Sequence, residues 1–262
     1  MIFIIGGNGL TGSAIVRYLK TKNIDFEIIQ KENKKDFFGK KCNLLIFANG
    51  NALKYRADED PLFDFDESLR SVSEYIHKID YDFFIHLSSV NVYHDTSSQN
   101  STKESTVIDT SKLSNYGFHK FLAEELVKHF CKNYLIFRMP GLVGPGLKKN
   151  PAFDFIDKNK DVMVSANSIH NYIHTDFMAQ CIFKIFDMGI KNEIFNLASQ
   201  NSIQLNSLRK IIGYDTKYTN SAKYTLQNYQ INTTKIQQHI TLSSSEEAIK
   251  IYFKQLNTFQ NI

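Results

Sequence analysis

The first twelve residues constrain the fold more than any other stretch of the chain. An apolar run at 2–5 leads into glycines at Gly6, Gly9 and Gly12, and an amphipathic segment follows at 14–19. A strand that is apolar on both faces is typical of a parallel sheet covered on both sides. Glycine permits positive φ and close approach of a ligand to the backbone, while a helix start offers N–H groups and a positive dipole end. The stretch therefore predicts a strand, a tight turn and a helix that bind an anion such as a pyrophosphate, the alternative being a glycine-rich turn without a ligand.

Length and composition favour a soluble α/β protein. A chain of 262 residues with 42% hydrophobic and 22% charged residues can form one large domain, or one domain with a lobe. The net charge of +4 comes from scattered lysines, which does not indicate nucleic-acid binding. The apolar start is too short for a signal peptide, and no run of about 18 apolar residues occurs, so we expect a cytoplasmic protein without a membrane span. Cys42, Cys131 and Cys181 lack metal-ligand spacing, so we expect reduced thiols and no metal site.

The order of apolar segments predicts a Rossmann-type doubly wound parallel sheet over residues 1–146. A small C-terminal α/β substrate lobe is expected over 147–262, intertwined with the first domain as one compact unit. After the first strand, strands are expected at 26–29, 43–48, 82–89, 134–137 and 194–197, and helices at 62–79, 116–132, 151–156, 175–188 and 244–256. Too little chain lies between the second and third strands for a crossover helix and another strand, so one unit looks trimmed. A polar stretch at 95–111 predicts a long surface loop over the mouth of the cleft.

The end of the second strand bears on the choice of cofactor. In a dinucleotide-binding fold a carboxylate here binds the ribose hydroxyls of NAD, whereas basic residues accommodate the 2′-phosphate of NADP. This chain has Gln30, Lys31, Lys34 and Lys35, with Glu32 as the nearest acid. The pattern favours NADP, with NAD as the alternative. The lysines could equally belong to a solvated loop.

Tyr116, Lys120 and Ser89 form the candidate catalytic group. Tyr116 and Lys120 are four residues apart, which places them on one face of a helix. A free tyrosine has a pKa of about 10, and a nearby ammonium should lower it toward the working range. Ser89 ends a predicted strand, where ligands of open α/β sheets bind. A second such pair, Tyr18 and Lys22, lies away from the strand ends and is interpreted as surface and packing.

Several motifs together resemble the extended short-chain dehydrogenases/reductases, of the nucleotide-sugar epimerase, dehydratase and ketoreductase group. The matching segments are the glycine turn and residues 48–50, 86–93, 115–120, 138–146, 172–176 and 194–198, which span nearly the whole chain. The resemblance implies that Tyr116 is the acid/base, that Lys120 binds the nicotinamide ribose and that Ser89 orients the substrate.

The same resemblance implies the binding residues and the partners. Cofactor contacts are expected at Gly6, Gly9, Leu10, Thr11, Gly12, Gln30, Lys31, Ala48, Asn49, Gly50, Ser88, Lys120, Met139 and Pro140. Substrate contacts are expected at Asn91, Val92, Tyr93, Gly141, Val143 and His170. The implied substrate is a nucleotide sugar, and a homodimer through the helices around Leu69 and Phe121 is expected from the habit of the family.

Three departures from the family pattern narrow the expected reaction. Gln30 stands where NAD-using relatives carry an acid. Residues 169–171 lack the arginine that holds the phosphates of the sugar nucleotide in many relatives. Val90 and Asn91 follow Ser89 in place of an acidic pair, so 4,6-dehydration is not expected. We therefore expect an NADP-preferring reductase of a 4-keto sugar nucleotide. The alternatives are an NAD-dependent 4-epimerase and a non-catalytic cofactor-binding sensor or scaffold.

Overall fold

A six-stranded parallel sheet forms the centre of the protein in the computed structural model, which describes residues 1–157, 160–213, 217–221, 223 and 225–259. The strand order is β2-β1-β3-β4-β5-β9. The strands are β1 (Ile2–Ile5), β2 (Phe26–Ile29), β3 (Lys41–Phe47), β4 (Asp80–Ser89), β5 (Tyr134–Met139) and β9 (Glu193–Asn196). Every neighbouring pair is parallel, so the carboxyl ends of all six strands meet at one edge of the sheet. This confirms the predicted Rossmann-type fold.

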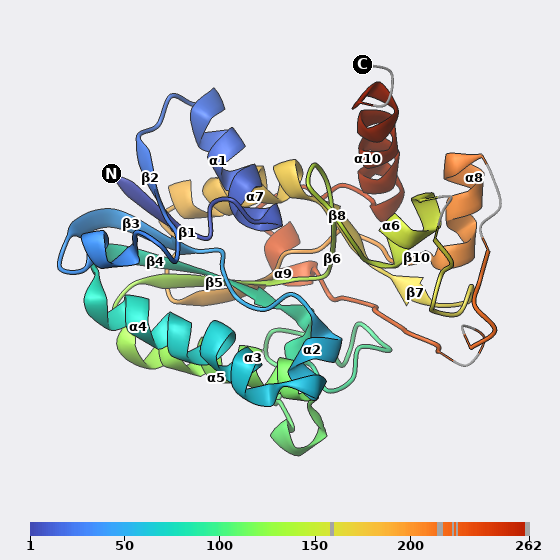
Figure 1. Cartoon of the computed structure of the whole chain (residues 1–262), viewed down its shortest axis with the longest axis horizontal. Coiled ribbons are helices and arrows are strands. Elements are labelled where there is room, and N and C mark those ends of the chain that lie inside the picture. Colours follow the sequence, from blue (N-terminus) through green and yellow to red (C-terminus); the bar gives the residue numbers. More distant parts are fainter. Residues whose placement is uncertain (158–159, 214–216, 222, 224, 260–262) are drawn as a thin grey trace.

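Helices cover both faces of this sheet (Figure 1). Helices α1 (Leu10–Thr21) and α7 (Thr175–Asp187) lie on one face, and α4 (Ser71–Lys78) and α5 (Asn115–Phe130) lie on the other. Neighbouring residues of a strand point to opposite faces, so Ile4 packs in the cluster with α1 and α7 whereas Ile5 packs in the cluster with α4 and α5. The apolar strands that the sequence shows are therefore buried on both sides.

The connection between the second and third strands is short, as the sequence predicts. Only a short 3-10 helix (Lys34–Phe37) connects β2 with β3, and β2 lies at the edge of the sheet beside β1. The side chain of Phe37 is buried against Phe3, with ring centroids 5.2 Å apart, so it covers part of the sheet face.

The helix predicted over 62–79 is interrupted. It consists of α3 (Pro61–Phe65), a π-helical turn (Asp66–Arg70) and α4, and it is preceded by α2 (Lys54–Glu59). Asp60 accepts a hydrogen bond from the N–H of Phe63, and Pro61 occupies the first helical position, which explains why α3 begins there. The apolar spacing did not reveal the π turn, which changes the faces presented before and after it.

The C-terminal part of the chain builds a small lobe beside the sheet (Figure 1). It contains α6 (Pro151–Ile156), α8 (Arg209–Ile212) and α10 (Ser245–Phe259), with α9 (Thr234–Gln237) lying nearer the sheet. Two strand pairs join it: β6 (Gly141–Val143) with β8 (Tyr172–His174), and β7 (Ile169–His170) with β10 (Ile203–Gln204). Its own apolar cluster centres on Phe155, Tyr172 and Tyr252. The short strand pairs were not predicted, because a strand of two or three residues is too short to show an alternation of apolar and polar residues.

The polar stretch at 95–111 is anchored at several points. Thr102 is fully buried, and its carbonyl accepts a hydrogen bond of 2.7 Å from the side chain of Asn196 at the end of β9. Glu104 accepts a hydrogen bond of 2.8 Å from the backbone N–H of Asn196, and Thr96 donates to the carbonyl of Asn228. The loop therefore connects the last sheet strand to the C-terminal segment, an arrangement that its composition alone did not indicate.

Candidate active site

The glycine turn has the backbone that the sequence predicts. Gly6 has φ +76°, and its carbonyl accepts a hydrogen bond of 3.0 Å from the N–H of Gly9. A Cβ atom at Gly12 would lie 2.2 Å from the Gly6 oxygen, so no other residue fits there without a shift of the turn. Gly9 caps α1 without a side-chain hydrogen bond. The first N–H groups of α1 are thus left for another acceptor, as an anion site requires.

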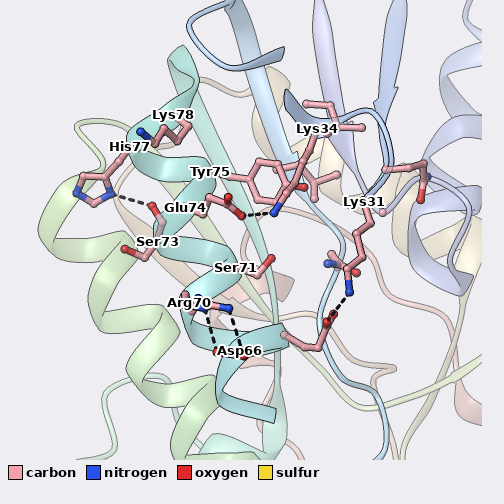
Figure 2. Close-up of a pocket in the computed structure, with 16 residues that line it drawn as sticks. Lys31, Lys34, Asp66, Arg70, Ser71, Ser73, Glu74, Tyr75, His77 and Lys78 are labelled. Carbon is pink, nitrogen blue, oxygen red and sulfur yellow. Dashed lines mark hydrogen bonds and ion pairs between the residues drawn. The ribbon is translucent and has the colours of Figure 1, made fainter. Parts of the chain in front are cut away.

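A groove of about 720 Å³ begins at this turn and runs between the end of β2 and helix α4 (Figure 2). Ile5, Gly6, Gln30, Asn49 and Tyr75 are among the residues that line it. The side-chain nitrogen of Gln30 is buried and has no hydrogen-bond partner within the described part of the chain. A donor left in this state beside a glycine cradle suits a polar ligand, so the groove fits the adenosine part of a dinucleotide.

Charged side chains pair across this groove, as Figure 2 shows. Lys34 contacts Glu74 at 2.7 Å, and Lys31 lies 3.8 Å from Glu67. Arg70 contacts Asp66 at 2.9 Å on the neighbouring turn of the π helix. The side chain of Lys31 is 83% exposed, so its ion pair is weak. Two of the three lysines predicted to receive a 2′-phosphate, Lys31 and Lys34, therefore face carboxylates already.

Ser89, Tyr116 and Lys120 meet at the carboxyl end of β4. Ser114 caps α5 by accepting a hydrogen bond of 3.2 Å from the N–H of Gly117, which starts the helix beside the end of the strand. The ammonium of Lys120 lies 5.6 Å from the ring centroid of Tyr116, one turn away. A hydrogen bond with the Ser89 side chain is among the influences that lower the pKa of Tyr116. Strand and helix thus bring together the three residues that the sequence predicts as a group.

Asn91 orients the Ser89 hydroxyl. Its backbone N–H and its side-chain Nδ2 both donate to Ser89 Oγ, at 3.2 and 2.9 Å. A Cβ at Gly117 would lie 2.3 Å from the carbonyl oxygen of Asn91, so the glycine allows α5 to pack directly on this turn. Because Ser89 Oγ accepts twice from Asn91, its own hydrogen is left to donate toward Tyr116 or a substrate oxygen.

Burial dominates the ionisation of Tyr116 and Lys120, the two candidate catalytic side chains. It raises the pKa of Tyr116 to about 12, while the hydrogen bond with Ser89 acts in the opposite direction. Burial also lowers the pKa of Lys120 to about 8, opposed by the charge of Asp64. Burial therefore outweighs the lowering of the Tyr116 pKa that is expected from the Lys120 ammonium.

A buried network uses side chains that were assigned to ligands. Ser88 donates a hydrogen bond of 2.5 Å to Glu124, which also forms an ion pair of 2.6 Å with Arg138. Arg138 in turn donates to the hydroxyl of Tyr93, which donates to Asn196. Although burial opposes the charge of Arg138, the neighbouring Glu124 carboxylate raises its pKa above the usual range. The side chains of Ser88 and Tyr93 are thus held by the protein itself, and their predicted contacts with cofactor and substrate stay predictions.

The surroundings of the predicted substrate residues differ. Val92 and Val143 are fully buried in apolar clusters, and their contact with a substrate stays a prediction. Gly141 lies against the ring of Tyr172. His170 is stacked between Tyr172 and Tyr229, with both centroid distances 5.6 Å, and its Nε2 has no partner within the described residues. Burial, helped by the charge of Lys54, lowers the pKa of His170 to about 4, so the ring is neutral at pH 7.

Residues 48–50 lie where the resemblance implies a cofactor. Thr11 donates a hydrogen bond of 3.4 Å to the carbonyl of Ala48, which ties the start of α1 to the end of β3. Asn49 lines the groove. Gly50 has φ +120°, and a Cβ there would lie 2.8 Å from Lys120 Nζ, so this glycine makes room for the lysine. Leu10 is the first residue of α1, Met139 pairs with Ser89 in the sheet, and Pro140 follows.

Two side chains near the site were missed. Tyr229 donates to Asn91 Oδ1 at 3.1 Å and hydrogen-bonds with Lys54, which joins the C-terminal segment to α2. Asp64 is fully buried and contacts His119 Nδ1 at 2.6 Å. Tyr229 stands in a polar stretch and Asp64 among other acids, so no motif or periodicity distinguished either residue.

No group of three His, Cys, Asp or Glu side chains within the described ranges is arranged to hold a metal ion. None of the helices in the part that the structure describes is both long and apolar enough to cross a membrane.

The turn, the groove and the Ser, Tyr and Lys group define the class of protein. The model of the NAD dependent epimerase/dehydratase family matches residues 67–198, which is half of the 262 residues. The chain therefore belongs to this family, within the extended short-chain dehydrogenases/reductases, and is an NAD(P)-dependent enzyme. A search of curated proteins by sequence gave no significant match.

Solved structures support the fold over the full length. A UDP-glucose 4-epimerase from Thermotoga maritima with UDP-glucose has 17% identity, TM-score 0.78 and coverage of 99% of each chain. A UDP-glucuronic acid 4-epimerase from Bacillus cereus with UDP-glucuronic acid and NAD has 15% identity, TM-score 0.78 and coverage of 98% of this chain and 99% of that one. RMD from Pseudomonas aeruginosa with NADPH has 12% identity, TM-score 0.81 and the same coverage. At these identities the likeness shows the fold alone.

Proposed function

We propose that the protein is an NADP-preferring reductase that acts on the 4-keto group of a nucleotide-linked sugar. The observation that carries this proposal is the convergence of Ser89, Tyr116 and Lys120 at the strand ends, beside the glycine turn. Residues around Gly6, Gly12 and Gly50 would hold the dinucleotide, which supplies hydride to the carbonyl carbon when bound. A homodimer through the helices around Leu69 and Phe121 stays a prediction.

The protein's own residues handle the oxygen of the substrate. The Ser89 hydrogen, directed outward by the two donors of Asn91, bonds the ketone oxygen and holds it toward Tyr116. The Tyr116 hydroxyl donates its proton to that oxygen as the carbon gains hydride, so the ketone becomes an alcohol and the phenolate is reprotonated from water. Its raised pKa suits this direction, because the group is protonated at pH 7. The ammonium of Lys120 stabilises the phenolate while it lasts.

Preference for NADP is supported by the end of β2. Gln30 and Lys31 occupy the strand end, and no carboxylate stands there to accept the ribose hydroxyls. Lys31 and Lys34 line the groove beside Gln30, so a 2′-phosphate could recruit both. The substrate class is supported by solved structures of the same fold that hold UDP-glucose or UDP-glucuronic acid.

An NAD-dependent 4-epimerase is the second candidate, and the ion pairs of the groove favour it. Glu67 and Glu74 already contact Lys31 and Lys34, so a 2′-phosphate would have to compete with two carboxylates. In this reaction the same Tyr116 would first accept and then return a proton on one sugar oxygen, with no net use of cofactor.

One pair of assays separates these candidates. Purified protein would be mixed with a UDP-linked 4-keto sugar and NADPH or NADH, and absorbance at the nicotinamide band would be followed. In parallel, UDP-glucose and UDP-glucuronic acid with NAD would be followed by proton NMR for inversion at carbon 4. Consumption of NADPH faster than NADH supports the reductase, whereas inversion without net cofactor use supports the epimerase. Cofactor binding without turnover of any sugar would favour a non-catalytic protein.

A further inference from the structure

Two carboxylates are buried beside the catalytic lysine, and their surroundings differ. Glu124 on α5 and Asp64 on α3 are both fully buried. Glu124 receives three hydrogen bonds from the Arg138 guanidinium, so its charge is compensated by a dedicated cation. Asp64 has no arginine or lysine ion partner among the described residues, which leaves its charge available to the site nearby.

Uncharged groups and one histidine hold Asp64 in place. Asn51 Nδ2 donates to Asp64 Oδ1 at 2.8 Å, and Ser68 Oγ donates to the same oxygen at 3.3 Å. His119 Nδ1 contacts the other oxygen at 2.6 Å, and its ring packs edge-on against Phe65. A carboxylate fixed in this way is oriented but not neutralised by Asn51 and Ser68.

Lys120 lies within the electrostatic reach of this carboxylate. Its residue is 5% exposed, and it forms no ion pair within the described part of the chain. Gly50 lies between Lys120 and the Ser68 hydroxyl that is bound to Asp64. A Cβ atom at Gly50 would lie 2.8 Å from Lys120 Nζ and 3.8 Å from Ser68 Oγ, so the lysine and the residues around Asp64 are close together. The charge of Asp64 raises the pKa of Lys120 against the larger effect of burial.

We propose that Asp64 is a positioning residue that keeps Lys120 in its ammonium form inside the buried site. Asn51 and His119 hold the carboxylate in place, and the π-helical turn that follows α3 carries Ser68 to it. The ammonium is what a cofactor ribose and the Tyr116 phenolate require, so Asp64 sets the upper pH limit of the working site. Only the effect on turnover rests on the proposed function, because the charge of Lys120 can be measured without any reaction.

Each titratable group that faces Lys120 has a different influence. Tyr116, one turn earlier on α5, becomes anionic only well above pH 7 because burial raises its pKa to about 12. His86 on β4 is buried and neutral, since burial and the Lys120 charge lower its pKa to about 3. Glu124, one turn later, is occupied by Arg138. Asp64, with His119 bound to it, is therefore the carboxylate whose removal should matter.

The test is a pH titration of Lys120 in the full-length protein by NMR of lysine labelled with 13C at Cε, assigned with Lys120→Arg. In the Asp64→Asn variant we expect the Lys120 midpoint to fall by about one pH unit, as for loss of a nearby opposite charge. The alkaline limb of the pH profile of kcat/KM for NADPH-dependent reduction should move down with it. Asp58→Asn is the matched control, since this exposed aspartate bonds Asn115 and should leave the midpoint unchanged.

The outcomes that would overturn the proposal are distinct from a failure of the proposed function. An unchanged Lys120 midpoint in Asp64→Asn would refute the role of Asp64, even if the protein proved to be an epimerase. His119→Gln keeps the carboxylate, so an equally large shift there would assign the effect to the histidine and also refute it. If Asp64→Asn does not fold, the double variant Asp64→Asn, His119→Gln replaces it, because its two amide side chains form a neutral pair that can hydrogen-bond. The same fall of the Lys120 midpoint is expected in the double variant.

Discussion

The charged side chains at the two ends of the proposed cofactor site differ in their exposure to solvent. At the catalytic end the Arg138 and Glu124 side chains are 4% and 0% exposed, and Lys120 is buried beside them. At the adenosine end Lys34 and Glu74 are 27% and 32% exposed, and Lys31 is mostly in solvent. Water screens the second set but not the first. Single charge or hydroxyl changes should therefore have large effects near Tyr116 and small ones near Gln30.

The largest effect is expected for Tyr116→Phe. Loss of the proton donor should lower kcat by about 10²-fold to 10⁴-fold, the range typical of general acid catalysis. Cofactor binding, measured by fluorescence of NADPH, should change little, because the hydroxyl is used on the substrate. A wild-type kcat in this variant would contradict the comparison, because Tyr116 would then not be the proton donor.

The chain offers a matched control for this variant. Tyr18 on α1 stands four residues before Lys22, the residue that follows the helix, so the pair has the same spacing away from the site. The ring of Tyr18 stacks on Phe183, with centroids 4.8 Å apart. Tyr18→Phe should keep kcat near the wild-type value, because burial there serves packing only. A comparable loss of kcat in Tyr18→Phe would mean that the assay reports stability and not proton transfer.

The next effect concerns stability at the buried end. Arg138→Met leaves the Glu124 carboxylate in the interior with only the Ser88 hydroxyl, which should lower the free energy of unfolding by about 3–5 kcal/mol. Arg70→Met removes an exposed ion pair with Asp66 and should cost less than about 1 kcal/mol. Urea unfolding followed by circular dichroism measures both. Equal losses in the two variants would contradict the proposed difference in screening.

Sequence patterns predicted the parts of the molecule that rest on local spacing. The glycine turn, the parallel strands and the Tyr116 and Lys120 pair follow from periodicity and from the steric needs of glycine. The trimmed unit was evident from chain length alone. These features are local, so a single stretch contains the information for each.

The remainder depends on contacts between distant segments. Asp64 and His119 are 55 residues apart, and Ser88 and Glu124 are 36 apart, so nothing in either stretch indicates the other. The resemblance assigned Ser88 and Tyr93 to ligands because motif positions say where a residue lies but not which partner its side chain finds. The π turn at 66–70 was likewise hidden, because its apolar residues keep nearly helical spacing.

The smallest effect is expected at the adenosine end, where it sharpens the comparison most. If NADP is preferred, Lys34→Gln should weaken NADPH binding relative to NADH by about twofold to fivefold, the value of one screened ion pair. Glu74→Gln should act in the opposite direction, since it frees Lys34 for a 2′-phosphate. Lys35→Gln is the control, because this neighbouring lysine is exposed and does not line the groove. Fluorescence titrations with both cofactors give the ratio; a ratio that Lys34→Gln leaves unchanged would favour NAD and the epimerase, because Glu74 would then be the partner that Lys34 keeps.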